Sequence, residues 1–224
     1  MLKRIIIAVC VAALICPAVY AAEPKVWYSM DDEQNVWREE DSGRVKADVD
    51  VQYVDGTVFM WFQADSAVWI FNPYNLEHAP VYIPLRKNED CLDLMMSGDG
   101  SVFVLGLTPE TIAAYTPSGE PVIRTPGILP VFWKDSYRFA YTSCVKGTRR
   151  GRGQNVHTWR GVSVFEVFPE ENNGKPGVLV TPVIKATRTA DYIASGIDAD
   201  GNCIVIKREG TSEEELHVPF PAAG

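Results

Sequence analysis

The sequence predicts an all-β fold: a small or partial β-propeller of about 4-5 four-stranded blades, following an N-terminal signal peptide. Three observations predict it. Asp-Gly turns recur in front of apolar strands, 15 prolines and 17 glycines separate short runs, and nothing after the signal shows a sustained apolar period near 3.6 residues. We therefore expect short antiparallel strands in a propeller-like β domain over residues 22–224.

Residues 1–21 have the pattern of a secretory signal peptide. Two basic residues precede an apolar run from Ile5 to Cys16, and small residues follow. The run is shorter than the about 20 residues of a membrane-spanning helix, which makes an uncleaved anchor the weaker alternative. A lipid anchor at Cys16 is disfavoured because a small residue usually precedes a lipidated cysteine, and Ile15 stands here. We expect a secreted or periplasmic protein with no stable membrane span after signal cleavage.

The acidic composition argues against polyanions as general partners. The chain has 29 Asp and Glu against 21 Lys and Arg, a formal net charge of -8 at pH 7. Loss of the signal removes two further basic residues, so the mature chain is more acidic still. Nucleic acid and anionic membrane surfaces are therefore not expected partners.

The first predicted strands surround an acidic turn and are followed by a longer repeat. KVWYSMDDEQNVWREEDSGRV (25–45) predicts two strands, which would be the outer strands of a blade completed by the C-terminus. VDGTVFMWF (54–62) then predicts a turn and an apolar strand. Residues 66–85 predict a strand, an Asn-Pro turn and a last short strand.

Related patterns recur downstream. SGDGSVFVLGLTPETIAAYTPSGEPV (97–122) predicts a turn, two apolar strands and a closing turn. ADGNCIVIK (199–207) repeats its turn and first strand, KDSYRFAYT (134–142) is a weaker relative of that part, and GVSVFEVFPEENNGKPGVLVTPV (161–183) is a further copy of the second half. Asp-Gly supplies the positive φ that tight hairpin turns need. The spacing from Gly56 to Gly100 suits the roughly 45 residues of one blade. A β-sandwich with similar turns is the alternative fold.

Two of these segments resemble a known repeat family. GDGSVFVLGLTPETIAAYTPSGEPV and GIDADGNCIVIKREG are similar to blades of NHL-type and streptogramin-lyase-like propellers, in which Asp-Gly, an apolar strand, a short turn and a second strand precede a Tyr-x-Pro-x-Gly turn. The resemblance implies a propeller at the level of single blades and carries no functional motif. Those families usually close with more blades than this chain can supply.

The mature chain keeps three cysteines, Cys91, Cys144 and Cys203. An odd number allows at most one internal disulfide, and each cysteine lies in an apolar, strand-like stretch. Three small buried residues are the favoured interpretation over any one pair. No spacing suggests structural zinc.

The most distinctive segment is VKGTRRGRGQNVHTWRG (145–161), which reverses the local charge of an acidic protein. It interrupts the third repeat between two hairpin strands. The predicted binding residues are Arg149, Arg150, Arg152, His157, Trp159 and Arg160. Arginine forks suit carboxylates and phosphates, and the rings could stack on a ligand, so an anionic partner is expected. A solvated hairpin end without a ligand is the alternative.

No cofactor is expected, although a divalent cation is an alternative. Lactonase-like propellers hold one ion on their axis, and blade-initial Asp55, Asp99 and Asp200 could supply its ligands. The same aspartates are what an Asp-Gly turn requires. The run from Asp198 to Asn202 spaces oxygen ligands as calcium loops do but lacks the closing glutamate.

The favoured function is an exported, non-catalytic module that binds a protein or an anionic envelope component through its loops. Serine-elbow and phosphate-loop motifs are missing from the sequence. One alternative is a metal-dependent lactonase- or lyase-like propeller enzyme. Another is a structural subunit of a larger envelope assembly, in which an incomplete ring would pair with another chain as an oligomer.

Overall fold

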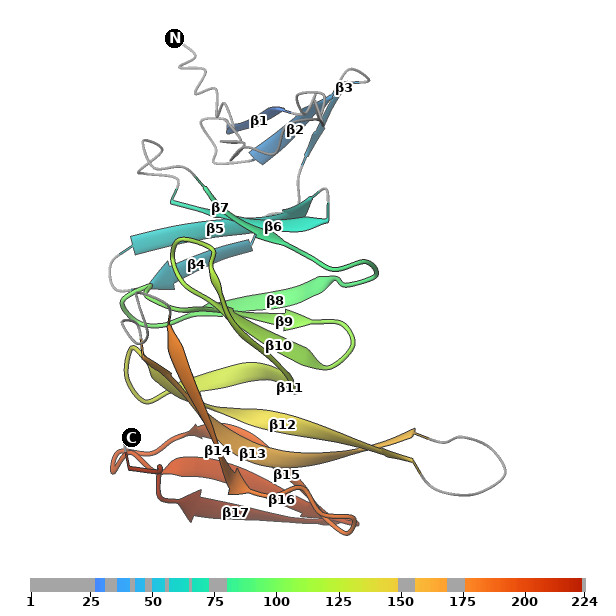
Figure 1. Cartoon of the computed structure of the whole chain (residues 1–224), viewed down its shortest axis with the longest axis vertical. Coiled ribbons are helices and arrows are strands. Elements are labelled where there is room, and N and C mark those ends of the chain that lie inside the picture. The colour runs from blue at the N-terminus through green and yellow to red at the C-terminus, as the bar shows by residue number, and fades with distance from the viewer. Residues whose placement is uncertain are drawn as a thin grey trace. The chain divides into compact units, whose positions relative to one another are not determined.

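The computed structural model describes residues 27–30, 36–40, 43–46, 50–54, 57–64, 66–72, 80–148, 156–168 and 176–222. These residues contain strands and no helix, and every strand pairing is antiparallel (Figure 1). The all-β prediction is therefore confirmed. None of the described secondary structure is a helix long and apolar enough to cross a membrane.

The chain divides into two compact units, Met1–Pro84 and Leu85–Gly224. The boundary lies inside the stretch that the sequence predicts as one domain. In the first unit, β1 (Trp27–Met30), β2 (Val36–Glu40) and β3 (Gly43–Lys46) form one sheet. A second sheet contains β4 (Asp50–Val54), β5 (Thr57–Ala64), β6 (Ala67–Phe71) and β7 (Val81–Pro84) in chain order.

The second unit is built on a seven-stranded sheet in the order β14-β13-β12-β11-β10-β9-β8. Its strands are β8 (Cys91–Met96), β9 (Phe103–Leu107), β10 (Thr111–Tyr115), β11 (Pro121–Trp133), β12 (Arg138–Thr148), β13 (Val156–Phe168) and β14 (Gly177–Ile184). A separate sheet contains β15 (Asp191–Ile197), β16 (Cys203–Glu209) and β17 (Ser212–Val218).

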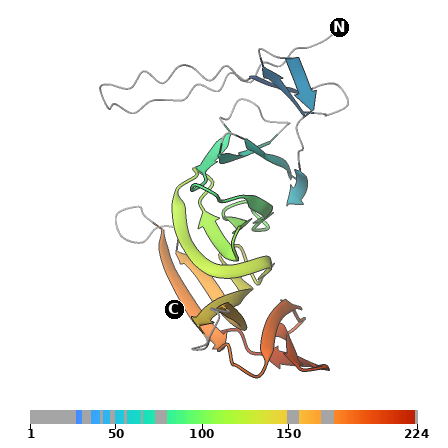
Figure 2. The ribbon, with the colours of Figure 1, turned by 90° about the vertical axis from the view of Figure 1, so that its right-hand side faces the viewer.

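The long strand β11 joins two halves of the seven-stranded sheet. Its first part pairs with β10, and its second part pairs with β12 from Gly127 onward. The register shifts between Ile128 and Val131, where the strand bends; Figure 2 shows its curvature. Bulges increase strand bending and twist. The segments that the sequence treats as separate repeats are therefore joined by β11 into one sheet.

Two apolar clusters lie on opposite faces of β12 and β13, as period-two alternation requires. On one face, Phe139, Tyr141 and Phe165 pack with residues of β9 and β10. On the other, Ala140, Val162 and Val164 pack against β15 and β16. The two strands are thus buried on both sides, which explains their dense apolar sequence.

The Asp-Gly turns predicted at two places have the same local geometry. Gly100 and Gly201 have positive φ of 69° and 79°. Their N–H groups donate to the carbonyls of Ser97 and Asp198 at 2.9 and 3.0 Å. These turns confirm the predicted strand reversals, because glycine adopts positive φ at no steric cost.

The expected completion of one blade by the two chain ends stays a prediction. β1, β2 and β3 pair among themselves, and β17 pairs with β16. β17 has its own partner because the turn after Glu209 brings it back onto β16.

Candidate binding surface around the hairpin of β12 and β13

The segment expected to be a basic loop is largely strand. β12 and β13 pair without a register shift from Arg138 and Glu166 to Thr148 and Val156. Val145, Thr158 and Trp159 are residue types that favour strands, so the ladder runs further than the charge pattern suggested. Arg149, Arg150 and Arg152 lie outside the described residues.

Arg160 is held in an ion cluster rather than presented alone. Its Nη2 lies 3.5 Å from Oε1 of Glu110, and its Nη1 lies 3.7 Å from Oδ2 of Asp191. Its backbone N–H donates to Oδ1 of Asp191 at 3.2 Å. Its Nε is buried and has no hydrogen-bond partner among the described residues. Two carboxylates thus already balance this charge, and Arg160 ties β13 to the starts of β10 and β15.

Trp159 packs on the backbone of the opposite strand. A Cβ added to Gly147 would lie 1.9 Å from the Trp159 ring, so the ring occupies the space that the glycine leaves. Gly147 pairs with His157, which makes Trp159 its diagonal neighbour. The Arg188 guanidinium lies 5.7 Å from the ring centroid. His157 is described only as a strand residue, and its side chain lies outside the description.

Three residues of this surface were missed by the sequence analysis: Glu110, Asp191 and Arg188. Glu110 also accepts a hydrogen bond from the Thr158 hydroxyl at 3.2 Å. Each belongs to another strand or connection, far from the hairpin in sequence. No local motif marks them, and the unusual basic charge at 160 was the only signal that an acidic partner should exist.

A groove of about 340 Å³ adjoins this ion cluster. Its apolar lining includes Leu92, Leu107, Ile128, Leu129 and Pro130, and Glu110 lies at its wall. Leu92 is 68% exposed, an unusual environment for a leucine. Because Glu110 also contacts Thr158 and Arg160, the groove and the hairpin form one continuous surface.

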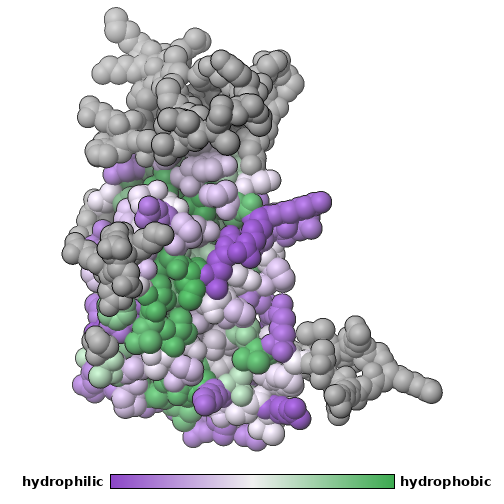
Figure 3. Space-filling view, in the orientation of Figure 1, coloured by the Kyte–Doolittle hydropathy of each residue, from purple (hydrophilic) through white to green (hydrophobic). Residues whose placement is uncertain are grey.

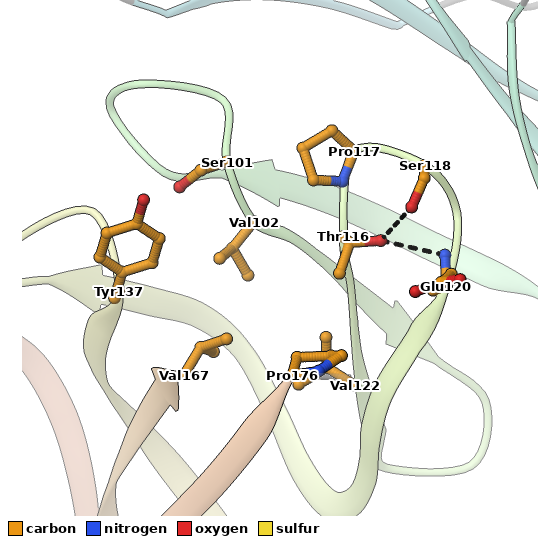
Figure 4. A pocket seen from close by; sticks show the side chains of 10 residues that line it. All are labelled: Ser101, Val102, Thr116, Pro117, Ser118, Glu120, Val122, Tyr137, Val167 and Pro176. Atoms are coloured by element: carbon orange, nitrogen blue, oxygen red, sulfur yellow. Dashed lines mark hydrogen bonds between the residues drawn. The ribbon is translucent and has the colours of Figure 1, made fainter. Parts of the chain in front are cut away.

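A second cavity of about 290 Å³ opens where β11 and β14 begin (Figure 4). Val102, Val122 and Val167 form its apolar lining. The Thr116 hydroxyl pairs with Ser118 at 2.7 Å and accepts from the Glu120 N–H at 3.1 Å. These polar groups stabilise their own turn. Apolar side chains also gather on the surface around β11 and β14 (Figure 3).

The blade-initial aspartates serve as turn residues where the structure describes them. Oδ1 of Asp99 accepts from the hydroxyls of Ser97 and Ser101 at 2.8 and 2.7 Å. Partial burial raises the pKa of Asp99, but these bonds outweigh it and lower the pKa to about 2. Asp55 lies outside the described residues, and within the described part no cluster of three metal-binding side chains occurs.

The described cysteines Cys91, Cys144 and Cys203 form no disulfide. Cys144 and Cys203 are buried, as predicted, whereas Cys91 is only half-buried. Burial raises the pKa of Cys203 to about 11 and also raises that of Cys144. Both thiols therefore stay protonated near neutral pH and pack as small apolar groups.

Comparison with models of protein families finds no match, and comparison with curated proteins finds none either. Function must therefore be argued from the surface itself. It combines an apolar groove, a balanced ion cluster and the end of a basic hairpin. An apolar groove beside charged side chains is an environment that can receive a ligand.

Proposed function

We propose that this chain is an exported, non-catalytic module that binds an anionic protein or envelope component through the end of the β12 and β13 hairpin. The observation that carries the proposal is the uninterrupted ladder of these strands. Its last described pair is Thr148 with Val156, and in the sequence residues 149–155 connect these two. A paired stem whose connecting sequence contains three arginines supports the binding of an anion.

The surroundings of the stem support this proposal. Arg160 forms ion pairs with Glu110 and Asp191, which hold the hairpin to the starts of β10 and β15. Lys146 and Arg188 are exposed on the described surface beside it. Positive charge in an otherwise acidic protein attracts an anionic partner while the rest of the surface repels it, which favours one binding orientation.

The propeller architecture is part of the same proposal. β4 to β7 form a four-stranded antiparallel meander, and β8 to β11 follow one another in the same way. A four-stranded meander is the unit of a propeller blade. Loops at the ends of such meanders are where propellers bind partners, which suits the position of the hairpin.

The proposal is tested by capturing partners from an envelope extract. Arg149, Arg150 and Arg152 are replaced together by serine in the full chain, and capture is compared with wild type at low and high salt. We expect the captured partner to be lost in the variant and weakened by salt, because both changes remove charge attraction. Folding should be unchanged, because the three arginines are not part of the described strand ladder. Circular dichroism checks this.

A matched control separates local from overall charge. The variant Lys87→Ser, Lys207→Ser, Arg208→Ser removes the same number of positive charges at the start of the second unit and on β16. We expect it to capture the partner as wild type does. Equal loss in both variants, or capture that neither salt nor the arginine change affects, would refute binding through the hairpin.

A further inference from the structure

We propose that the groove beside Leu92 receives an apolar side chain from an extended acidic segment of a protein partner. This inference rests on the proposed function, because the acidic residues of the segment would bind beside the basic hairpin. It goes further by naming a peptide, rather than a lipid surface or a polysaccharide, as the bound chemistry. The groove supports this choice because it can accept a single apolar side chain, which a peptide supplies.

Two β-bulges build the groove. On β8, Cys91 pairs with Leu107 and Asp93 with Gly106, so Leu92 is the unpaired extra residue. On β11, Ile128 and Val131 are paired while Leu129 and Pro130 are skipped. All three unpaired residues line the groove. Bulges redirect side chains and are frequent beside functional sites, so two of them facing one groove indicate a built feature.

The floor of the groove is closed by packing. A Cβ on Gly106 would lie 2.7 Å from Cδ1 of Leu129, so the Leu129 side chain of β11 packs directly on the backbone of β9. Leu92, by contrast, remains 68% exposed. An apolar side chain of a partner would be buried between the exposed Leu92 and the packed Leu129, which is favourable because apolar surface leaves water.

The charges next to the groove define the rest of the ligand. Two carboxylates line the groove. Glu110 lies within hydrogen-bond distance of Thr158 and within 3.5 Å of Arg160, so its charge is balanced, and Oδ1 of Asp93 accepts from the Leu94 N–H at 2.7 Å. Thr158 pairs with Lys146, whose side chain is exposed. Cross-strand neighbours lie about 5 Å apart, so an apolar side chain in the groove would bring the next residues of its segment to Lys146. Carboxylates at those positions complement it.

The probe for this proposal is a phage-displayed library of random peptides, selected on the immobilised full chain. We expect enriched peptides to carry one large apolar residue followed closely by aspartate or glutamate. Synthetic copies should lose affinity about tenfold or more when the protein carries Leu92→Ser, as loss of burial of one leucine contact implies. Lys146→Glu should also weaken them.

Matched variants make the result specific. Leu179→Ser removes a 43% exposed leucine from β14, away from the groove, and should leave peptide affinity unchanged. Lys87→Glu, at an exposed turn residue, makes the same charge change as Lys146→Glu and should also leave peptide affinity unchanged. Leu92 is exposed, so Leu92→Ser should retain wild-type folding, which circular dichroism checks.

The outcomes separate the two proposals. Peptides that are acidic without an apolar residue, or that ignore Leu92→Ser, would overturn the groove inference and leave the hairpin proposal standing. Apolar peptides that depend on Leu92 but not on salt or the arginines would refute the hairpin proposal. Failure to enrich any peptide, with binding instead to vesicles of phosphatidylcholine and phosphatidylglycerol, would overturn the peptide assignment.

Discussion

His217 shows how single residues in this protein connect strands through charge. Its Nδ1 lies 2.7 Å from Oδ2 of Asp198, and its Nε2 lies 3.1 Å from Oε1 of Glu215. Both ring nitrogens face carboxylates, and the imidazolium form can donate to both at once, so this geometry favours the protonated ring. The hydrogen bond to Asp198, and after it the one to Glu215, raises the pKa of His217. The hydrogen bond to His217 is also the main cause that lowers the pKa of Asp198.

This pair predicts a pH-dependent contribution to stability. A raised pKa in the folded state stabilises the protein fully below the ordinary pKa of 6.5. The contribution is lost as the pH rises through the raised value. Replacing His217→Gln should therefore lower the melting temperature at mildly acidic pH and make little difference at alkaline pH. Thermal unfolding of both proteins across this range measures the effect.

The background variant Asp198→Asn is the control for this prediction. With the carboxylate removed, His217→Gln should change the melting temperature by an amount that depends much less on pH. A pH dependence that persists undiminished in the Asp198→Asn background would assign the effect to another group. Asp198 also accepts from the N–H groups of Asp200 and Asn202, so the background itself will be less stable.

At the scale of elements, the turns and strands were largely predictable and their extents were not. Asp99-Gly100 and Asp200-Gly201 reverse the chain as predicted, because positive φ is a local property of glycine. The full length of β12 and β13 was not predicted, because the basic residues around position 150 are typical of a loop. What extends the ladder is contact across strands, such as Trp159 on Gly147.

The contact of Trp159 with Gly147 can be tested directly. Gly147→Ala places a methyl group where the ring lies, so the ring must move and its packing is lost. We expect a loss of about 1–2 kcal/mol in the free energy of unfolding, as for other overpacked sites. Urea unfolding measures it, and a red shift of tryptophan fluorescence would accompany it.

Gly98→Ala, in the turn before β9, is the matched control. A Cβ there meets nothing within 4 Å, and the residue does not need positive φ. We expect its stability to stay within about 0.5 kcal/mol of wild type. If both alanine variants behave alike, the ring does not depend on the space above Gly147.

At the scale of the whole molecule, the sheets end in edge strands that must avoid pairing with other chains. β17 ends its sheet and carries three consecutive glutamates, Glu213 to Glu215, with side chains 58 to 61% exposed. Glu213 and Glu214 pair with Arg208 and Lys207 on β16. Charged residues on an edge strand oppose the approach of a second acidic chain.

Neutralising this edge should promote self-association. We expect the variant Glu213→Thr, Glu214→Thr, Glu215→Thr to form dimers or larger species at concentrations where wild type does not, because threonine suits an open strand edge. Sedimentation velocity measures this. The control Asp90→Asn, Glu120→Gln, Asp200→Asn removes equal charge at exposed turns. Association of both variants would point to net charge rather than to the edge.

The sequence by itself determined the all-β class, the Asp-Gly reversals and the position of the basic segment between two hairpin strands, because each depends on neighbouring residues. The sharing of β11 between two halves of one sheet needed the tertiary structure. So did the ion cluster of Glu110, Arg160 and Asp191 and the groove at Leu92. These features join residues from separate strands, and their contacts arise from register, bulges and sheet curvature, which no local pattern encodes.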